Sequence, residues 1–192
     1  MAVWQFHLIV IPKKGVIKKY GNVPDTFRAF VDTDGFRKYA IPTKDSMEEG
    51  AFSAPNCWNL IEIEPTEIIQ QIDKYVKRCK DYDDSDDLYV SWKTHVRNVI
   101  DNDAELIVNK QTGKIEEFSF RADLRDKSLT FLKQMIELAK RYDWLFLDAK
   151  GNIANPNMSE VGHLIKISNP FRFLQNPEQF FTDLQDGSLK IE

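Results

Sequence analysis

A hairpin pattern in the second half of the chain is the feature that most constrains its fold. Residues 104–108 and 115–124 are predicted to be strands, and the polar segment 109–114 between them contains Gly113, which suits the positive-φ position of a tight turn. Side chains alternate along the second strand, with apolar Phe118, Phe120, Ala122 and Leu124 on one face and polar Glu117, Ser119, Arg121 and Asp123 on the other. We therefore expect one packed sheet face and one that is wet or covered by a partner.

Two amphipathic helices accompany this hairpin. Residues 128–142 carry apolar side chains over about half of the helical circumference, and Asp126 or Ser128 can cap the start. A second helix is predicted over 64–80, because a proline lies in its first turn and an apolar stripe extends to Cys79. Further strands are predicted at 3–11, 58–63, 88–92 and 144–147.

The remaining segments are less regular. Residues 13–56 show little periodicity apart from a short helix predicted over 24–31, and Pro12 and Gly15 are interpreted as the end of the first strand. The C-terminal part is predicted to be helical, with caps at Ser159 and Asn176.

The order strand, helix, hairpin, helix, strand is that of the split βαβ arrangement of ferredoxin-like folds. We expect a single α+β domain over 1–192, with an antiparallel or mixed sheet, helices on one face and a helical C-terminal extension. A division into two subdomains, 1–100 and 101–192, is the alternative.

The composition excludes several classes of protein. With 192 residues, 42% of them hydrophobic, and a net charge of −4, the chain can bury a substantial core but lacks the basic excess of proteins held mainly by nucleic-acid phosphates. Cys57 and Cys79 cannot form the disulfide framework of a secreted domain. Residues 1–12 lack the basic start of a signal peptide, and no run approaches the roughly 20 apolar residues that span a bilayer. We expect a cytoplasmic protein that binds neither nucleic acid nor membrane.

Five aspartates lie close together after the helix predicted over 64–80: Asp81, Asp83, Asp84, Asp86 and Asp87. An EF-hand loop counted from Asp81 would need glycine at its sixth position and glutamate at its twelfth, where this chain has Asp86 and Trp92. The three histidines and two cysteines are too dispersed for a zinc site. We predict no metal and no cofactor, and the acidic loop is either a solvated connection or a patch that binds a partner.

Familiar catalytic motifs are absent from the sequence. Neither a glycine-rich phosphate-binding loop nor a G-x-S-x-G nucleophile motif occurs, and neither cysteine carries a sign of activation. The sequence therefore favours a non-catalytic protein. One alternative stays open, in which His95 and Asp101 or Asp103 form an acid–base pair in a cleft that also contains Arg121.

The segment 120–125 is the most distinctive part of the chain. Arg121 and Asp123 are predicted to share a strand face, with Arg125 just beyond the strand end. Arginine suits planar, bidentate recognition of a ligand or partner. These three residues and the acidic loop are therefore the candidate partner contacts. A surface charge ladder with a contact at the start of the following helix is the alternative.

Several short patterns follow one another between residues 103 and 142. They are the acidic and apolar strand 104–107, the turn at 112–115, the Arg-x-Asp-Leu-Arg strand end at 121–125 and an amphipathic helix. This combination resembles immunity proteins of bacterial polymorphic-toxin systems. The resemblance implies an intracellular, non-catalytic protein that binds and blocks a cognate toxin, and it supplies no catalytic residues.

The leading hypothesis is a cytoplasmic binding protein with a protein partner such as a basic toxin domain, since an acidic surface steers association with a basic one. The alternatives are an enzyme with an unrecognised site and an assembly protein. In the assembly protein, an oligomer contact would contain Trp4, Trp92, Phe171, Phe173, Phe180 and Phe181. The sequence does not predict the oligomeric state.

Overall fold

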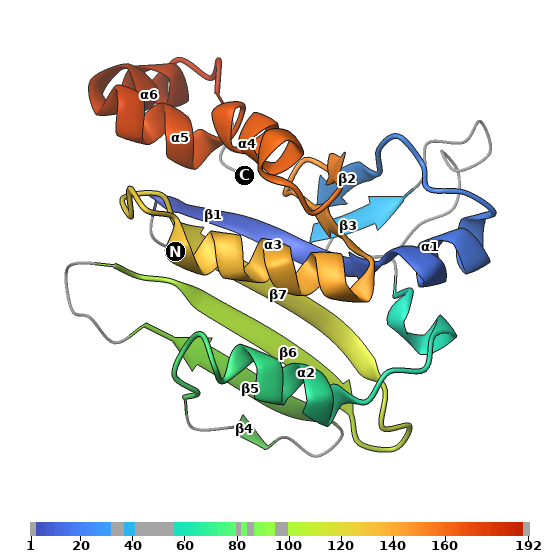
Figure 1. Ribbon diagram of the computed structural model, residues 1–192. Helices are drawn as coiled ribbons and strands as arrows, with labels where there is room; N and C mark the ends of the chain where they lie inside the picture. Colours follow the sequence, from blue (N-terminus) through green and yellow to red (C-terminus); the bar gives the residue numbers. More distant parts are fainter. Residues whose placement is uncertain are drawn as a thin grey trace.

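The computed structural model describes residues 3–31, 37–40, 56–79, 82–83, 87–94 and 100–189. Its main element is a seven-stranded sheet in the order β4-β5-β6-β7-β1-β8-β9, in which neighbouring strands are antiparallel (Figure 1). Its strands are β1 (Gln5–Pro12), β4 (Tyr82–Asp83), β5 (Asp87–Lys93), β6 (Asp103–Asn109), β7 (Ile115–Asp123), β8 (Trp144–Leu147) and β9 (Ile153–Ala154). A separate ladder pairs β2 (Arg28–Val31) with β3 (Arg37–Ala40). The helices are α1 (Lys13–Tyr20), α2 (Pro65–Ile72), α3 (Thr130–Tyr142), α4 (Met158–Lys166), α5 (Asn169–Gln175) and α6 (Pro177–Gln185).

The strands β6, β7, β1 and β8 have the connectivity of a split βαβ fold. β7 leads into α3, and α3 leads into β8, while β1 lies between β7 and β8 in the sheet. β5 and β4 extend the sheet beyond β6, and β9 extends it beyond β8. The prediction of an α+β fold with a ferredoxin-like antiparallel sheet is confirmed. The sheet takes strands from both sides of residue 100.

The pairing of β1 explains why this strand is almost wholly buried. Its residues 5–9 pair with β7 and its residues 9–12 pair with β8. Leu8 and Val10 point to the face that α2 and α3 cover, whereas Ile9 and Ile11 point to the other face. The strand is therefore covered on both sides near Ile11, as its sequence predicts.

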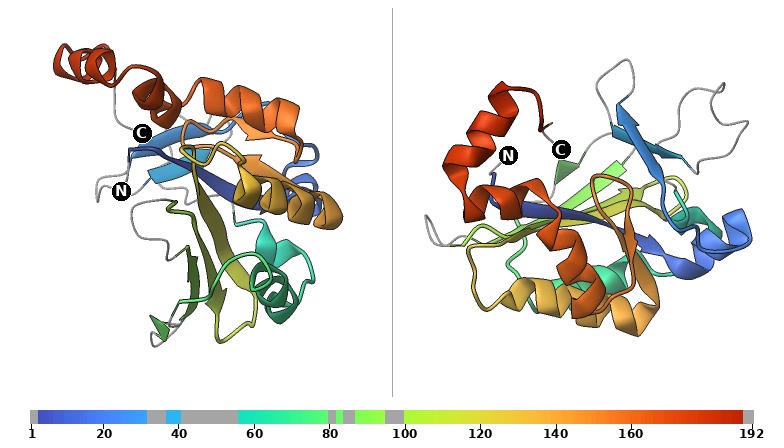
Figure 2. Two further views of the ribbon diagram at one scale, coloured as in Figure 1. Left: turned by 60° about the vertical axis from the view of Figure 1, so that its left-hand side comes forward. Right: turned by 90° about the horizontal axis from the view of Figure 1, so that it is seen from above.

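The larger core lies between the sheet and the helices α2 and α3, which cover one sheet face (Figures 1 and 2). The ring centroid of Trp144 is 5.3 Å from that of Trp58 and 5.8 Å from that of Phe118, in edge-on geometry. Each buried side chain of this kind contributes roughly 1.5–3 kcal/mol to folding. The predicted apolar face of α3 supplies Phe131, Leu132, Met135, Ile136, Leu138 and Ala139.

A smaller core lies on the opposite sheet face and includes a residue of α1. Its buried members are Ile9, Ile11, Val16, Phe27, Cys57, Leu145 and Leu147. A Cβ atom at Gly15 would lie 2.1 Å from the carbonyl oxygen of Cys57, so only glycine fits this close approach. The interpretation of Gly15 as a break is wrong, because Pro12 ends β1 and Gly15 lies inside α1.

The helix predicted over 24–31 is also wrong, because the second half of this segment is strand β2. The backbone N–H of Phe27 donates to the carbonyl oxygen of Gly151 at 2.8 Å, and the hydroxyl of Thr26 donates to the same oxygen at 2.8 Å. Pairing with a distant loop therefore overrides the local helical pattern.

The strand predicted over 58–63 is instead a 3₁₀ turn at Trp58–Leu60. The side-chain oxygen of Asn56 accepts hydrogen bonds from the backbone N–H groups of Trp58 and Asn59, at 3.2 and 3.4 Å. These hydrogen bonds to the Asn56 side chain stabilise a turn in a segment whose apolar residues predicted a strand.

Helix α2 ends at Ile72, well before the predicted end near residue 80. Asp73 is its C-cap residue, and the Asp73 carboxylate accepts a hydrogen bond from the indole of Trp92 at 2.8 Å and pairs with Arg78. The backbone N–H of Cys79 then donates to the carbonyl oxygen of Ser91 at 2.7 Å, so the chain runs along the edge of β5. The turn after the helix packs Tyr75 and Val76 against the same core, whereas Cys79, the last residue of the predicted apolar stripe, does not belong to it.

The helices α4, α5 and α6 form the predicted C-terminal extension (Figure 2). Asn176 caps α6, since its side-chain oxygen accepts the backbone N–H of Gln179 at 3.1 Å. The cap of α4 is Asn157 rather than the predicted Ser159. Within the described ranges, no helix combines the length and apolar character that crossing a bilayer requires.

The aromatic residues considered for an oligomer contact divide into different environments. Trp92 is 1% exposed and belongs to the larger core, so it cannot form a surface contact. Phe171 packs against the same core. Phe173, Phe180 and Phe181 pack on one another, with ring centroids 5.6–5.9 Å apart.

Candidate binding site

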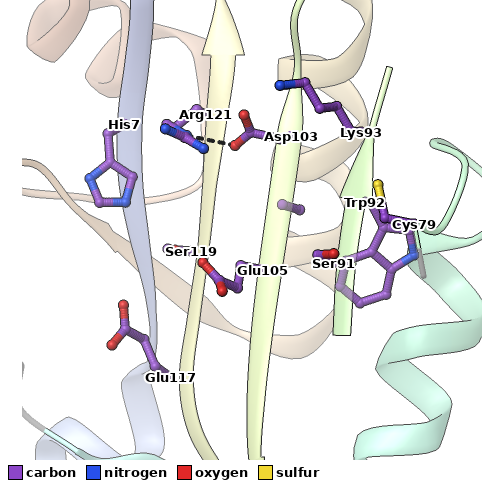
Figure 3. Close-up of a pocket in the computed structure, with 11 residues that line it drawn as sticks. His7, Cys79, Ser91, Trp92, Lys93, Asp103, Glu105, Glu117, Ser119 and Arg121 are labelled. Carbon is purple, nitrogen blue, oxygen red and sulfur yellow. Dashed lines mark hydrogen bonds and ion pairs between the residues drawn. The ribbon is translucent and has the colours of Figure 1, made fainter. Parts of the chain in front are cut away.

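The sheet face opposite α2 and α3 carries polar side chains from four adjacent strands. The register places His7 of β1 opposite Arg121 of β7. Asp103 of β6 lies between Arg121 and Lys93 of β5. These residues surround a recess of about 460 Å³ (Figure 3). We name this surface the polar face and define it by His7, Ser91, Lys93, Asp103, Glu105, Glu117, Ser119 and Arg121.

The sheet surface that carries the polar face becomes apolar towards the end of β1. Near Ile11, the smaller core and α1 cover this surface. Two positions earlier on β1, Ile9 is still buried and lies opposite Ser119, whereas His7 lies in the recess. The expectation that β7 has one packed face and one polar face is confirmed, and the polar side chains line a hollow.

Paired charges occupy one side of the polar face. Arg121 donates from Nε to an oxygen of Asp103 at 2.7 Å, and the amide of Gln5 donates to the other Asp103 oxygen at 3.1 Å. The ammonium group of Lys93 lies 3.3 Å from a carboxylate oxygen of Asp101. Both cations of the polar face therefore have anionic partners within the chain.

Two carboxylates on the other side of the polar face lack such partners. Glu105 and Glu117 lie on neighbouring strands β6 and β7, and neither carboxylate forms a hydrogen bond or ion pair with a described residue. Burial, together with the negative charge of Glu105, raises the pKa of Glu117. Two like charges thus lie near each other, and no described residue compensates them.

A β-bulge sets the position of Glu117. The register of β6 and β7 shifts between Ile107, which lies opposite Glu117, and Val108, which lies opposite Ile115. The extra residue is Glu116, whose carboxylate accepts a hydrogen bond from the side-chain amide of Asn56. A β-bulge changes the direction in which neighbouring side chains of its strand point. Here the bulge keeps Ile115 and Phe118 in the core while Glu117 lies in the recess.

Ser119 lies between these two glutamates in the recess. Its side chain lies directly opposite Glu105 across the two strands, and Ser119 is only 9% exposed. Its hydroxyl has no hydrogen-bond partner in the part of the chain that the structure describes. Because Ser119 lines the recess, its hydroxyl is available to a ligand that enters.

Asp123 and Arg125, two of the predicted partner contacts, are engaged within the fold. Asp123 is 1% exposed and binds Arg125 through its carboxylate. Burial by itself raises the pKa of Asp123, but hydrogen bonds from the Arg125 side chain and from backbone N–H groups of Arg125 and Asp101 lower it overall. Of the three residues predicted in this segment, only Arg121 lines the polar face.

Two of the five aspartates of the acidic loop belong to strands at one edge of the sheet. Asp83 ends β4 and Asp87 begins β5, while Asp81, Asp84 and Asp86 lie outside the described residues. His95, the candidate acid–base residue, also lies outside them. Its proposed partner Asp101 is the residue that pairs with Lys93.

Sequence reasoning did not single out Lys93, Glu105, Glu117 or Ser119 as site residues. The signal was present in the alternation of polar residues along the strand 115–124, but assigning a site required the order of the strands. Among the described residues, no three histidine, cysteine, aspartate or glutamate side chains are placed to hold a metal ion.

No protein-family model, curated protein or solved structure matches this chain. The arrangement can bind a molecule through charge and hydrogen bonds. It offers two carboxylates and one hydroxyl that have no partner within the described ranges, bordered by two cations that are already paired.

Proposed function

We propose that this chain is a non-catalytic binding protein that acts in the cytoplasm as an immunity-type inhibitor of a cognate bacterial toxin, and that the polar face contacts a basic region of that partner. The observation that supports the proposal is that Glu105 and Glu117 share a recess and have no ionic or hydrogen-bonding partner among the described residues. A basic partner would supply the missing counter-charges, and the net charge of −4 favours its approach. The similarity of residues 103–142 to immunity proteins agrees with this function.

The test is co-expression with the proteins encoded by neighbouring genes. We expect one of them to be toxic alone, to become harmless when this chain is present and to co-purify with it. A charge reversal on the polar face, Glu105→Arg, should reduce both protection and co-purification, whereas the reversal Glu137→Arg on the exposed surface of α3 should leave them unchanged. If no neighbouring product is toxic, bound or neutralised, the proposal is wrong.

An enzyme is the second candidate function, and a specific observation favours it. The recess brings together Arg121, His7 and Glu117, and the raised pKa of Glu117 is typical of acid–base groups in active sites. The two functions differ in stoichiometry. A binding inhibitor neutralises its toxin only when the two are present in about equal amounts, whereas an enzyme that inactivates the toxin acts at a small fraction of that amount. Titration of toxin activity with this chain separates them.

A further inference from the structure

We infer that Glu105, Glu117 and Ser119 form a seat for a single arginine side chain of the partner, which rests on the proposed binding function and names the chemistry that the polar face recognises. The two carboxylates and the hydroxyl all lie in the same recess (Figure 3). They come from β6 and β7, strands of seven and nine residues that pair with each other.

The unsatisfied groups are of one kind, because all of them can accept hydrogen bonds. Glu105 and Glu117 have no cationic or hydrogen-bonding partner among the described residues, and the same holds for the hydroxyl of Ser119. Ser119 is an independent sign of a ligand, because nine-tenths of this polar residue is removed from solvent and yet its hydroxyl opens into the recess. The ligand that completes these groups must donate several hydrogen bonds and carry positive charge.

The spacing favours a guanidinium over an ammonium ion. Glu105 lies opposite Ser119, and Glu117 lies two residues before Ser119 on β7, which makes the two glutamates diagonal neighbours. In an antiparallel pair of strands, two residues in this diagonal relation are about 7–8 Å apart, and their Cβ atoms are somewhat closer. A guanidinium has five N–H donors spread around a planar group and can bridge two carboxylates, whereas an ammonium is a compact point charge.

The neighbouring charges define the edge of the seat. Arg121 and Lys93 are held by Asp103 and Asp101, so they do not neutralise the glutamates. On the β1 side, Ile9 lies opposite Ser119, is 6% exposed and offers no polar group. An arginine would therefore lie along a partly apolar wall with its charged end between the two carboxylates, which is the usual way such a side chain is buried.

The experiment titrates the isotope-labelled full chain with Nα-acetyl-arginine methylamide and records backbone amide shifts by NMR. We expect saturable shifts centred on residues 105 and 117–119. The corresponding lysine derivative should bind several-fold more weakly, and the citrulline derivative, which is neutral but has nearly the same shape, should not bind there. Shifts of equal size with citrulline, or shifts centred elsewhere, would overturn the assignment.

Variants give a second measurement. The double variant Glu105→Gln, Glu117→Gln should lower the affinity for the arginine derivative by at least about tenfold, because it removes both charge-assisted hydrogen bonds. Glu137→Gln makes the same chemical change at an exposed carboxylate on α3 and should have no effect. If the double variant gives the well-dispersed spectrum of a folded protein and still binds the arginine derivative with unchanged affinity, Glu105 and Glu117 do not form the proposed arginine site.

The outcomes separate the seat from the proposed function. If the chain forms a complex with a neighbouring toxin but does not bind the arginine derivative, the seat is wrong and the function stands. If the arginine derivative binds at residues 105 and 117–119 but no toxin is bound or neutralised, the seat stands as a guanidinium site and the inhibitor function is wrong.

Discussion

Arg125 donates from Nε to both carboxylate oxygens of Asp123, at 2.9 and 3.1 Å, and a third hydrogen bond runs from its Nη2 at 2.5 Å. The same carboxylate accepts the backbone N–H of Asp101 at 2.8 Å, and the Arg125 guanidinium lies 4.2 Å from the ring centre of Trp4. This pair therefore ties the end of β7 to the loop before β6 and to the segment before β1. The Asp123–Arg125 pair thus connects β7 to the starts of β6 and β1, three of the strands that carry the polar face.

Removing one member of this pair should destabilise the fold. We expect Arg125→Ala to lower the free energy of unfolding by about 3 kcal/mol, because it leaves a fully buried carboxylate without its cation. The control is Arg121→Ala, which breaks a more exposed ion pair and should cost less than about 1 kcal/mol. Urea unfolding followed by circular dichroism measures both values. Equal losses would contradict the structural role assigned to Arg125.

The contribution of Asp123 should disappear in acid. Its pKa is lowered in the folded state, so the unfolded chain binds the proton more tightly and the stabilisation is present above the ordinary pKa of aspartate. It is lost as the pH falls through the lowered value. We expect Asp123→Asn to be clearly less stable than the parent chain at pH 7, with a difference that shrinks towards pH 2. A pH-independent difference in urea unfolding would show that packing alone explains the loss.

Two glycines in helices should respond to alanine in opposite directions. We expect Gly15→Ala to lower the free energy of unfolding by more than about 2 kcal/mol, because the new Cβ would meet the rigid backbone of Cys57. Gly162 in α4 has open space at the same position, so Gly162→Ala should stabilise the chain by about 0.5–1 kcal/mol. Thermal unfolding of the two variants measures the contrast, and a tolerated Gly15→Ala would mean that α1 and Cys57 are further apart.

The sequence predicts the second half of the chain well because its elements are long and strongly patterned. β7, α3 and β8 follow the predicted ranges to within a few residues, and Gly113 has the expected positive φ of 67°. In each case a local rule, either alternation or helical periodicity, agrees with the tertiary packing.

The first half is harder because distant contacts decide its structure. Thr26 and Phe27 form hydrogen bonds to Gly151, and Asp73, the C-cap residue of α2, is bound by Trp92. No local pattern contains these partners. The same reason limits prediction of the site: alternation along β7 indicates a polar face, but Lys93 and Glu105 join it only through the strand order.

Asp126 should contribute to the start of α3. Its carboxylate accepts the backbone N–H groups of Ser128 at 2.9 Å and Thr130 at 3.1 Å, although the N-cap position itself is Leu129, whose side chain forms no capping hydrogen bond. We expect Asp126→Ala to cost about 1 kcal/mol in urea unfolding. Lys127→Ala changes the exposed neighbouring residue and should have little effect. Equal stability of the Asp126 variant and the parent chain would show that the cap contributes nothing.

Glu117 should lower stability at neutral pH, as expected of a group kept for binding. Its raised pKa means that the folded state binds the proton more tightly, so stability falls as the pH rises from the ordinary value of 4.5 through the raised one. We expect Glu117→Gln to raise Tm at pH 7, by about 2–4 °C for each kcal/mol of relieved cost, and to have little effect at pH 4. Glu105→Gln should raise Tm as well, since it removes the charge that faces Glu117. Glu137→Gln serves as the control in the same calorimetric scans. A lower Tm for Glu117→Gln at pH 7 would show that the Glu117 carboxylate stabilises the free protein, contrary to its assignment as an uncompensated charge.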